Sequence, residues 1–96
     1  MTVYLRPEAW GDINDAADWY ERQRPGLGSE FLDEVLIAFS RIEETPLFYP
    51  SVRKNARRTL IRRFPFGIYY IVEGDDILVL AVMHGRRDPA KWRVRT

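Results

Sequence analysis

The chain has 96 residues, of which 46% are hydrophobic, and this length and composition fit one folded domain, residues 1–96, rather than a disordered chain. It contains no cysteine and one histidine, which argues against disulfides and thiolate or histidine metal sites, and we expect no cofactor. The formal net charge is +1, and neither a signal peptide nor a membrane span is evident, so we expect a soluble, cytoplasmic protein that binds no membrane.

Residues 2–6 alternate in side-chain character and predict a short strand. Pro7 ends this strand and suits the first turn of a helix, which we expect to run to about Arg24, where a Pro-Gly turn begins. We expect Asp12 to face outward and Trp19 to pack in the core or against a helix. The apolar face of this helix is predicted from spacings of three and four: Trp10, Ile13, Ala17 and Tyr20.

A second amphipathic helix is predicted after the turn. Ser29 is a candidate N-cap, and the dipeptide "TP" at 45–46 closes the helix. Its apolar stripe consists of Phe31, Val35, Phe39 and Ile42, widened by Leu32, Leu36 and Ala38. Two helices joined by so short a turn form an antiparallel hairpin, and residues 47–56 are predicted to be a loop.

The remainder predicts three strands, at residues 57–64, 66–72 and 76–84. The segment "EGDD" at 73–76 separates the last two strands and is typical of a hairpin turn. The last strand is almost continuously apolar, which places it in the interior of the sheet under the helical hairpin. The predicted order is β-α-α-β-β-β, an α+β fold with a small, mainly antiparallel sheet packed against two helices.

The charges divide along the chain. Residues 1–52 carry four basic and ten acidic side chains, whereas residues 53–96 carry eleven basic and four acidic ones. Such asymmetry favours a nucleic-acid or acidic protein partner on the basic side. Simple attraction between acidic helices and a basic sheet is the alternative explanation.

Several segments, in this order, resemble one known family. They are "WYERQRPGLGSEFLDEV", "IEETPLFYP", "RRFPFGIYYIVEGDDILVLAVMHGRRDP" and the tryptophan at 92. Together they resemble the RelE/ParE superfamily of bacterial toxins, in particular the ParE-like branch of plasmid stabilisation proteins. The resemblance implies a toxin of a type II toxin–antitoxin system, growth inhibition, and a hetero-oligomer with a cognate antitoxin.

Two modes of action are known in this superfamily, and they require different residues. RelE-like members are metal-independent endoribonucleases that cleave mRNA on the ribosome, which requires an acid, a base and cations around the phosphate. His84 is the best acid or base candidate, with Arg62 and Arg86 as cations. The tyrosine that some nucleases use near the C-terminus is missing here, since none follows Tyr70, and Glu73 lies at the far end of the last strand from His84.

ParE-like members act on DNA gyrase without cleaving nucleic acid, and the residues favour this mode. Arginine and tryptophan are frequent anchors of protein interfaces. We therefore expect His84 and Asp88 to shape the functional segment. The expected target contacts are Arg57, Arg58, Arg63, Arg86, Arg87, Asp88, Lys91 and Trp92. The alternatives are the mRNA endonuclease and a non-toxic binding module with the same fold. Each residue also has a structural alternative: the strand arginines are the solvated face of an edge strand, and His84 hydrogen-bonds the neighbouring backbone.

Overall fold

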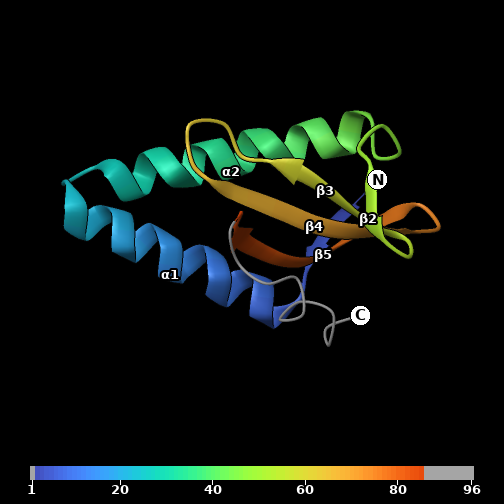
Figure 1. Cartoon of the computed structure of the whole chain (residues 1–96), viewed down its shortest axis with the longest axis horizontal. Coiled ribbons are helices and arrows are strands. Elements are labelled where there is room, and N and C mark those ends of the chain that lie inside the picture. Colours follow the sequence, from blue (N-terminus) through green and yellow to red (C-terminus); the bar gives the residue numbers. More distant parts are fainter. Residues whose placement is uncertain (1, 86–96) are drawn as a thin grey trace.

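The protein is a five-stranded sheet covered on one face by a helical hairpin, as described by a computed structural model for residues 2–85 (Figure 1). The elements in chain order are β1 (Thr2–Leu5), α1 (Pro7–Gln23), α2 (Leu27–Glu44), β2 (Ser51–Arg53), β3 (Ala56–Leu60), β4 (Phe66–Glu73) and β5 (Asp76–His84). The strand order is β1-β5-β4-β3-β2, and only the β1–β5 pair is parallel. The predicted α+β architecture is confirmed, with one additional strand, β2.

Helix α1 begins at Pro7, as predicted, but its buried stripe is not the predicted one. The sheet side is formed mainly by small residues, Ala9, Ala16 and Ala17, together with Ile13. Trp10 and Trp19 are 56% and 52% exposed, so the prediction that they are core residues is wrong. The alanines allow α1 to lie close to the sheet, and this shifts the stripe about one residue away from the tryptophans.

Helix α2 begins three residues earlier than predicted. Gly26 is its N-cap residue, so Ser29 lies inside the helix and does not cap it. The cap comes from α1, because the Glu21 carboxylate accepts hydrogen bonds from the backbone N–H groups of Gly26, at 2.9 Å, and Gly28, at 3.0 Å. A carboxylate at this position satisfies free N–H groups and complements the helix dipole. Of the predicted α2 stripe, Leu32 and Leu36 are exposed.

The last hairpin matches the sequence pattern. Glu73 pairs with Asp76, leaving a two-residue turn in which Gly74 has φ +60°, a conformation that glycine adopts without a side-chain clash. Strand β5 lies between β1 and β4, and its central residues are buried, as predicted. Beyond the end of β1, the backbone N–H of Val82 donates to the Asp12 carboxylate at 2.9 Å, so Asp12 faces the sheet rather than outward.

The region between α2 and β4 differs most from the prediction. Residues 51–53 form β2, which the sequence placed in a loop; this strand is too short to show a periodic pattern. Strand β3 ends at Leu60, so Arg62 and Arg63 lie in the turn to β4 rather than in the strand. Arg63 has φ 73°, which a continuous strand does not permit.

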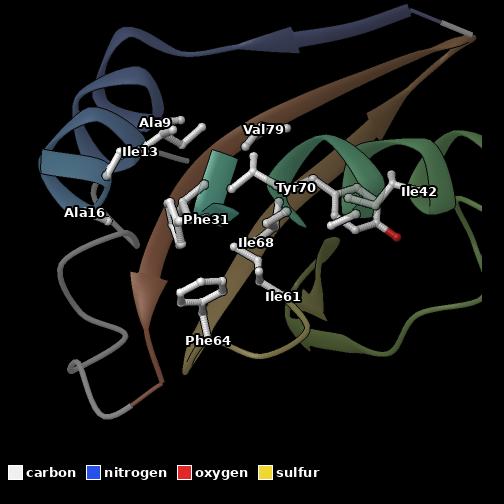
Figure 2. Close-up of a cluster of buried hydrophobic side chains, with 14 of the residues drawn as sticks. Ala9, Ile13, Ala16, Phe31, Ile42, Ile61, Phe64, Ile68, Tyr70 and Val79 are labelled. Carbon is white, nitrogen blue, oxygen red and sulfur yellow. The ribbon is translucent and has the colours of Figure 1, made fainter. Parts of the chain in front are cut away.

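The two faces of the sheet have separate apolar clusters. On the helix side, Phe31 of α2 contacts Phe64 and Phe66 edge-on, with ring centroids 5.2 and 5.3 Å apart. Figure 2 shows this cluster between the helices and strands β4 and β5. On the other face lie Ala56, Tyr69, Leu80, Ala81 and Met83. Side chains of neighbouring residues in a strand therefore lie in different environments, and this applies to the adjacent arginines Arg57 and Arg58 of β3.

Candidate functional site

Adjacent arginines of β3 have different environments. Arg57 pairs with Tyr70, a member of the helix-side cluster, whereas Arg58 pairs with Tyr69 of the opposite cluster. The Arg57 guanidinium donates from Nη1 to the backbone carbonyls of Leu47, at 3.1 Å, and Tyr49, at 2.6 Å. Arg57 thus holds the segment after α2, and its guanidinium is already engaged within the protein.

The Arg58 side chain lies on the face of the sheet away from the helices. Its stem lies against Gly67 of β4, where an added Cβ would be 3.2 Å from the Arg58 Cδ. The long apolar stem of an arginine packs in this way while its guanidinium remains at the surface. Arg58 therefore fits the predicted contact role better than Arg57 does.

A groove of about 460 Å³ runs along the outer side of β3, near the place where β2 stops pairing with it. Arg41 reaches from α2 and donates to the carbonyl of Leu60 at 2.8 Å. Among residues 2–85, those that line the groove include three arginines and no acidic residue: Arg41, Tyr49, Pro50, Arg58, Thr59, Leu60 and Arg62. We call this the arginine groove; its chemistry suits carboxylate or phosphate groups next to apolar ones.

The sequence located only part of this groove. Arg58 and Arg62 were candidates, but Arg41, Tyr49 and Pro50 were not. Arg41 follows the helical period of α2, and no local pattern indicates that its guanidinium crosses to a strand 19 residues away.

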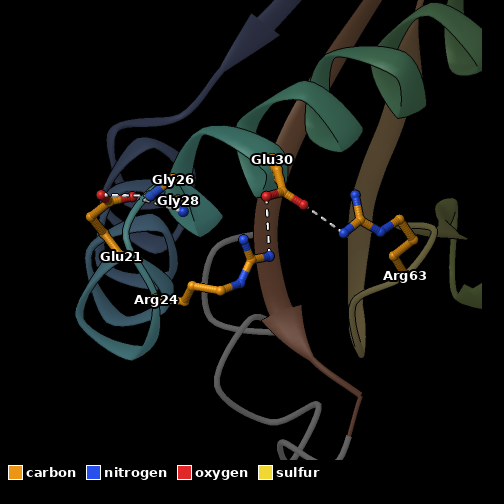
Figure 3. A network of polar contacts seen from close by, with 6 residues as sticks. All are labelled: Glu21, Arg24, Gly26, Gly28, Glu30 and Arg63. Carbon is orange, nitrogen blue, oxygen red and sulfur yellow. Dashed lines mark hydrogen bonds and ion pairs between the residues drawn. The ribbon is translucent and has the colours of Figure 1, made fainter.

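Arg63 belongs to a separate ionic network at the start of α2 (Figure 3). Its Nη2 lies 2.7 Å from Glu30 Oε1, and Arg24 Nη2 lies 3.1 Å from Glu30 Oε2. The hydrogen bond from Arg63, followed by that from Arg24, lowers the pKa of the Glu30 carboxyl below its ordinary value. Arg63 thus pairs within the protein rather than joining Arg58 in the arginine groove.

His84 ends β5 and pairs with Phe66, with ring centroids 5.5 Å apart, on the face that the helices cover. The next residue, Gly85, donates its N–H to the Pro65 carbonyl at 2.7 Å, so His84 lies at the same end of the sheet as the turn containing Arg62. Arg58 belongs to the opposite face. Glu73 lies at the far end of the β4–β5 ladder, as predicted.

The remaining candidates belong to the C-terminal segment of the sequence. Arg86, Arg87, Asp88, Lys91 and Trp92 lie outside the described residues. Within residues 2–85, no group of three or more metal-ligating side chains is found. In the same part of the chain, no helix is long and apolar enough to cross a membrane.

The sequence of the chain matches the family model of the ParE toxin of the type II toxin–antitoxin system parDE over residues 3–89. The chain belongs to the ParE toxin family. A chain of the chromosomal ParDE toxin–antitoxin system from P. aeruginosa has a similar structure, with a TM-score of 0.78 at 18% identity; the match covers 88% of this chain and 95% of that one. No curated protein sequence matches the chain. The resemblance to the ParE-like branch inferred from the sequence is thus confirmed, and the arginine groove is a surface of a ParE-family fold.

Proposed function

We propose that this chain is the toxin of a type II toxin–antitoxin pair, that it inhibits DNA gyrase by binding to it, and that a cognate antitoxin neutralises it. The match to the ParE toxin over residues 3–89 carries the proposal, because it includes the helical hairpin and the sheet. Within this proposal, the antitoxin acts by covering the surface that the target needs.

The arginine groove supports a protein as the binding partner. Its guanidinium groups lie beside Tyr49, Pro50 and Leu60, and Leu60 is 62% exposed. A mixture of arginine, aromatic and aliphatic side chains is common at the centres of protein interfaces. An acidic protein segment with apolar side chains complements it in charge and in polarity.

Fewer residues support RNA cleavage than support binding. His84 lies at the same end of the sheet as Arg62, but Arg58 is on the opposite face, and no tyrosine follows Tyr70 to serve as a second acid or base. The proposal assigns the groove residues Arg58 and Arg62 to target contact. It also retains Arg86, Arg87, Lys91 and Trp92 as target contacts, with Asp88 shaping that segment.

Expression without the neighbouring gene tests the proposal. We expect growth arrest, intact mRNA, and inhibition of gyrase supercoiling by the purified protein. Rapid mRNA cleavage would favour the endonuclease instead, and normal growth would contradict any toxin. The variant R58A/R62A should lose most of the toxicity. Arg62 is exposed and contributes little to folding, whereas the Arg58 stem packs against Gly67, so urea unfolding must show that the variant stays folded. Arg22→Ala, an exposed arginine on α1, is the control and should remain toxic.

A further inference from the structure

The segment that follows α2 is held in place by three of its backbone carbonyls. The Tyr70 hydroxyl donates to the Pro46 carbonyl at 2.6 Å. Arg57 donates to the Leu47 and Tyr49 carbonyls, at 3.1 and 2.6 Å. Tyr70 is fully buried, so one of the donors is itself fixed by the core. The sheet therefore sets the backbone conformation of residues 46–49.

Two side chains in this segment are exposed to solvent. Leu47 is 64% exposed and Phe48 is 77% exposed, although both are large and apolar. The Phe48 ring meets the Tyr49 ring edge-on at 5.3 Å, which further limits its orientation. We call Leu47 and Phe48 the apolar anchor. Holding two such side chains in water on a fixed backbone does not help the isolated chain to fold, which points to a binding role.

A fixed backbone raises the value of exposed apolar side chains in binding. A partner that covers a flexible loop must also order it, whereas the anchor's backbone is ordered before contact. Interface residues that dominate affinity are often aromatic side chains that fill a pocket on the partner. Phe48 is such an aromatic side chain, and it is exposed on a backbone that is already fixed.

The arginine groove indicates which partner fits. Tyr49 stacks edge-on with Phe48 and also lines the groove with Arg41, Arg58 and Arg62, so anchor and groove form one surface. We propose that this surface docks an acidic segment of the antitoxin, with the apolar anchor filling a pocket between apolar side chains of that segment. The aliphatic Leu47 favours a protein over a nucleic acid, which offers stacking bases but few apolar pockets. This inference rests on the proposed function.

The test compares toxicity with neutralisation. Phe48→Ser and Leu47→Ser are expressed with and without the product of the gene beside this one, and the affinity of each purified variant for that product is measured by calorimetry. We expect both variants to stay folded and toxic alone, to escape neutralisation, and, for Phe48→Ser, to bind about 30-fold more weakly. The control is Tyr4→Ser, since Tyr4 is 52% exposed on β1 at the opposite edge of the sheet; it should bind as the wild type does.

A second variant tests the fixed backbone. Tyr70→Phe removes the hydroxyl that holds Pro46 and keeps both anchor side chains, and we expect a loss of affinity of about threefold to tenfold from a looser loop. Full neutralisation and unchanged affinity in Phe48→Ser would overturn the inference, as would loss of toxicity in that variant without loss of neutraliser binding. If the wild type is neither toxic nor bound by the neighbouring product, the proposed function fails together with it.

Discussion

The two ends of α2 are both fixed by side chains from other elements, but in different ways. At its start, the Glu21 carboxylate caps two N–H groups, and Glu30 pairs with Arg24 and Arg63. The paired arginines are more than half exposed, so water and salt compete for these contacts. After its end, Arg57 of β3 and Tyr70 of β4 donate hydrogen bonds to backbone carbonyls of the following segment, and Tyr70 is fully buried.

This difference indicates that the start of α2 has a structural role, whereas the segment after its end is suited to binding. The start of α2 presents polar groups that satisfy one another, so its surface needs no partner. The end presents Leu47 and Phe48 to solvent on a backbone held by Arg57 and by the buried Tyr70. We therefore expect stability at the start to depend on close packing rather than on charge, and stability at the end to depend on the buried Tyr70 donor.

The largest effect should come from Gly28→Ala at the start of α2. A Cβ at this position would lie 2.7 Å from the Ala17 carbonyl oxygen of α1, so the helices must separate. We expect a loss of about 2 to 3 kcal/mol, near the upper part of the range for overpacked sites. Urea unfolding followed by circular dichroism measures it.

Gly11→Ala is the matched control on α1, where an added Cβ meets nothing within 4 Å. There the same substitution should stabilise the protein by up to about 1 kcal/mol, because alanine favours the helix. Equal effects at both positions would show that the close contact of the two helices is not what fixes the start of α2.

At the end of α2, Tyr70→Phe should cost about 1 to 2 kcal/mol, since the Pro46 carbonyl loses its donor. Burial raises the pKa of Tyr70 to about 12, above the ordinary value near 10. The neutral hydroxyl therefore stabilises the fold fully below pH 10, and this contribution is lost as the pH rises toward 12. Urea unfolding at pH 7 to 11 measures both effects.

The phenylalanine variant should lack this part of the alkaline loss of stability. Tyr4→Phe is the control, because Tyr4 is 52% exposed and should leave the stability curve unchanged at neutral pH. An identical alkaline profile in Tyr70→Phe and wild type would contradict the buried-donor account of this end.

Features that depend on neighbouring residues were predictable from the sequence. The helices follow from apolar spacing, and the last hairpin follows from Gly74 in a two-residue turn. The burial of β5 follows from its continuous apolar run. Each signal lies within one element, so no knowledge of the partner element is needed.

The site depended on contacts between distant residues, and there the sequence was less informative. Arg57 and Arg58 look alike in the sequence, and only the pairing with Tyr70 and Tyr69 separates a residue that holds a loop from one that lines a groove. Trp10 has the spacing of a core residue but is exposed, because small alanines define the packed side of α1. The segment that carries Phe48 is held in part by the hydroxyl of Tyr70, 24 positions away from the Pro46 carbonyl that it contacts.

The smallest effect should come from Glu30→Gln, which tests whether charge matters at the start of α2. The hydrogen bonds from Arg63 and Arg24 lower the pKa of Glu30, so its contribution is present at neutral pH and is lost as the pH falls through that lowered pKa. Because these groups are exposed, we expect a small shift of the unfolding midpoint at low salt that shrinks at 1 M salt. Glu43→Gln, on an exposed residue near the end of the same helix, should shift nothing. NMR titration should give a pKa for the Glu30 carboxyl below its ordinary range. An ordinary pKa would contradict this account. So would a shift of the unfolding midpoint in Glu30→Gln as large as that in Tyr70→Phe, because the start of α2 would then depend on charge as strongly as its end depends on the buried hydroxyl.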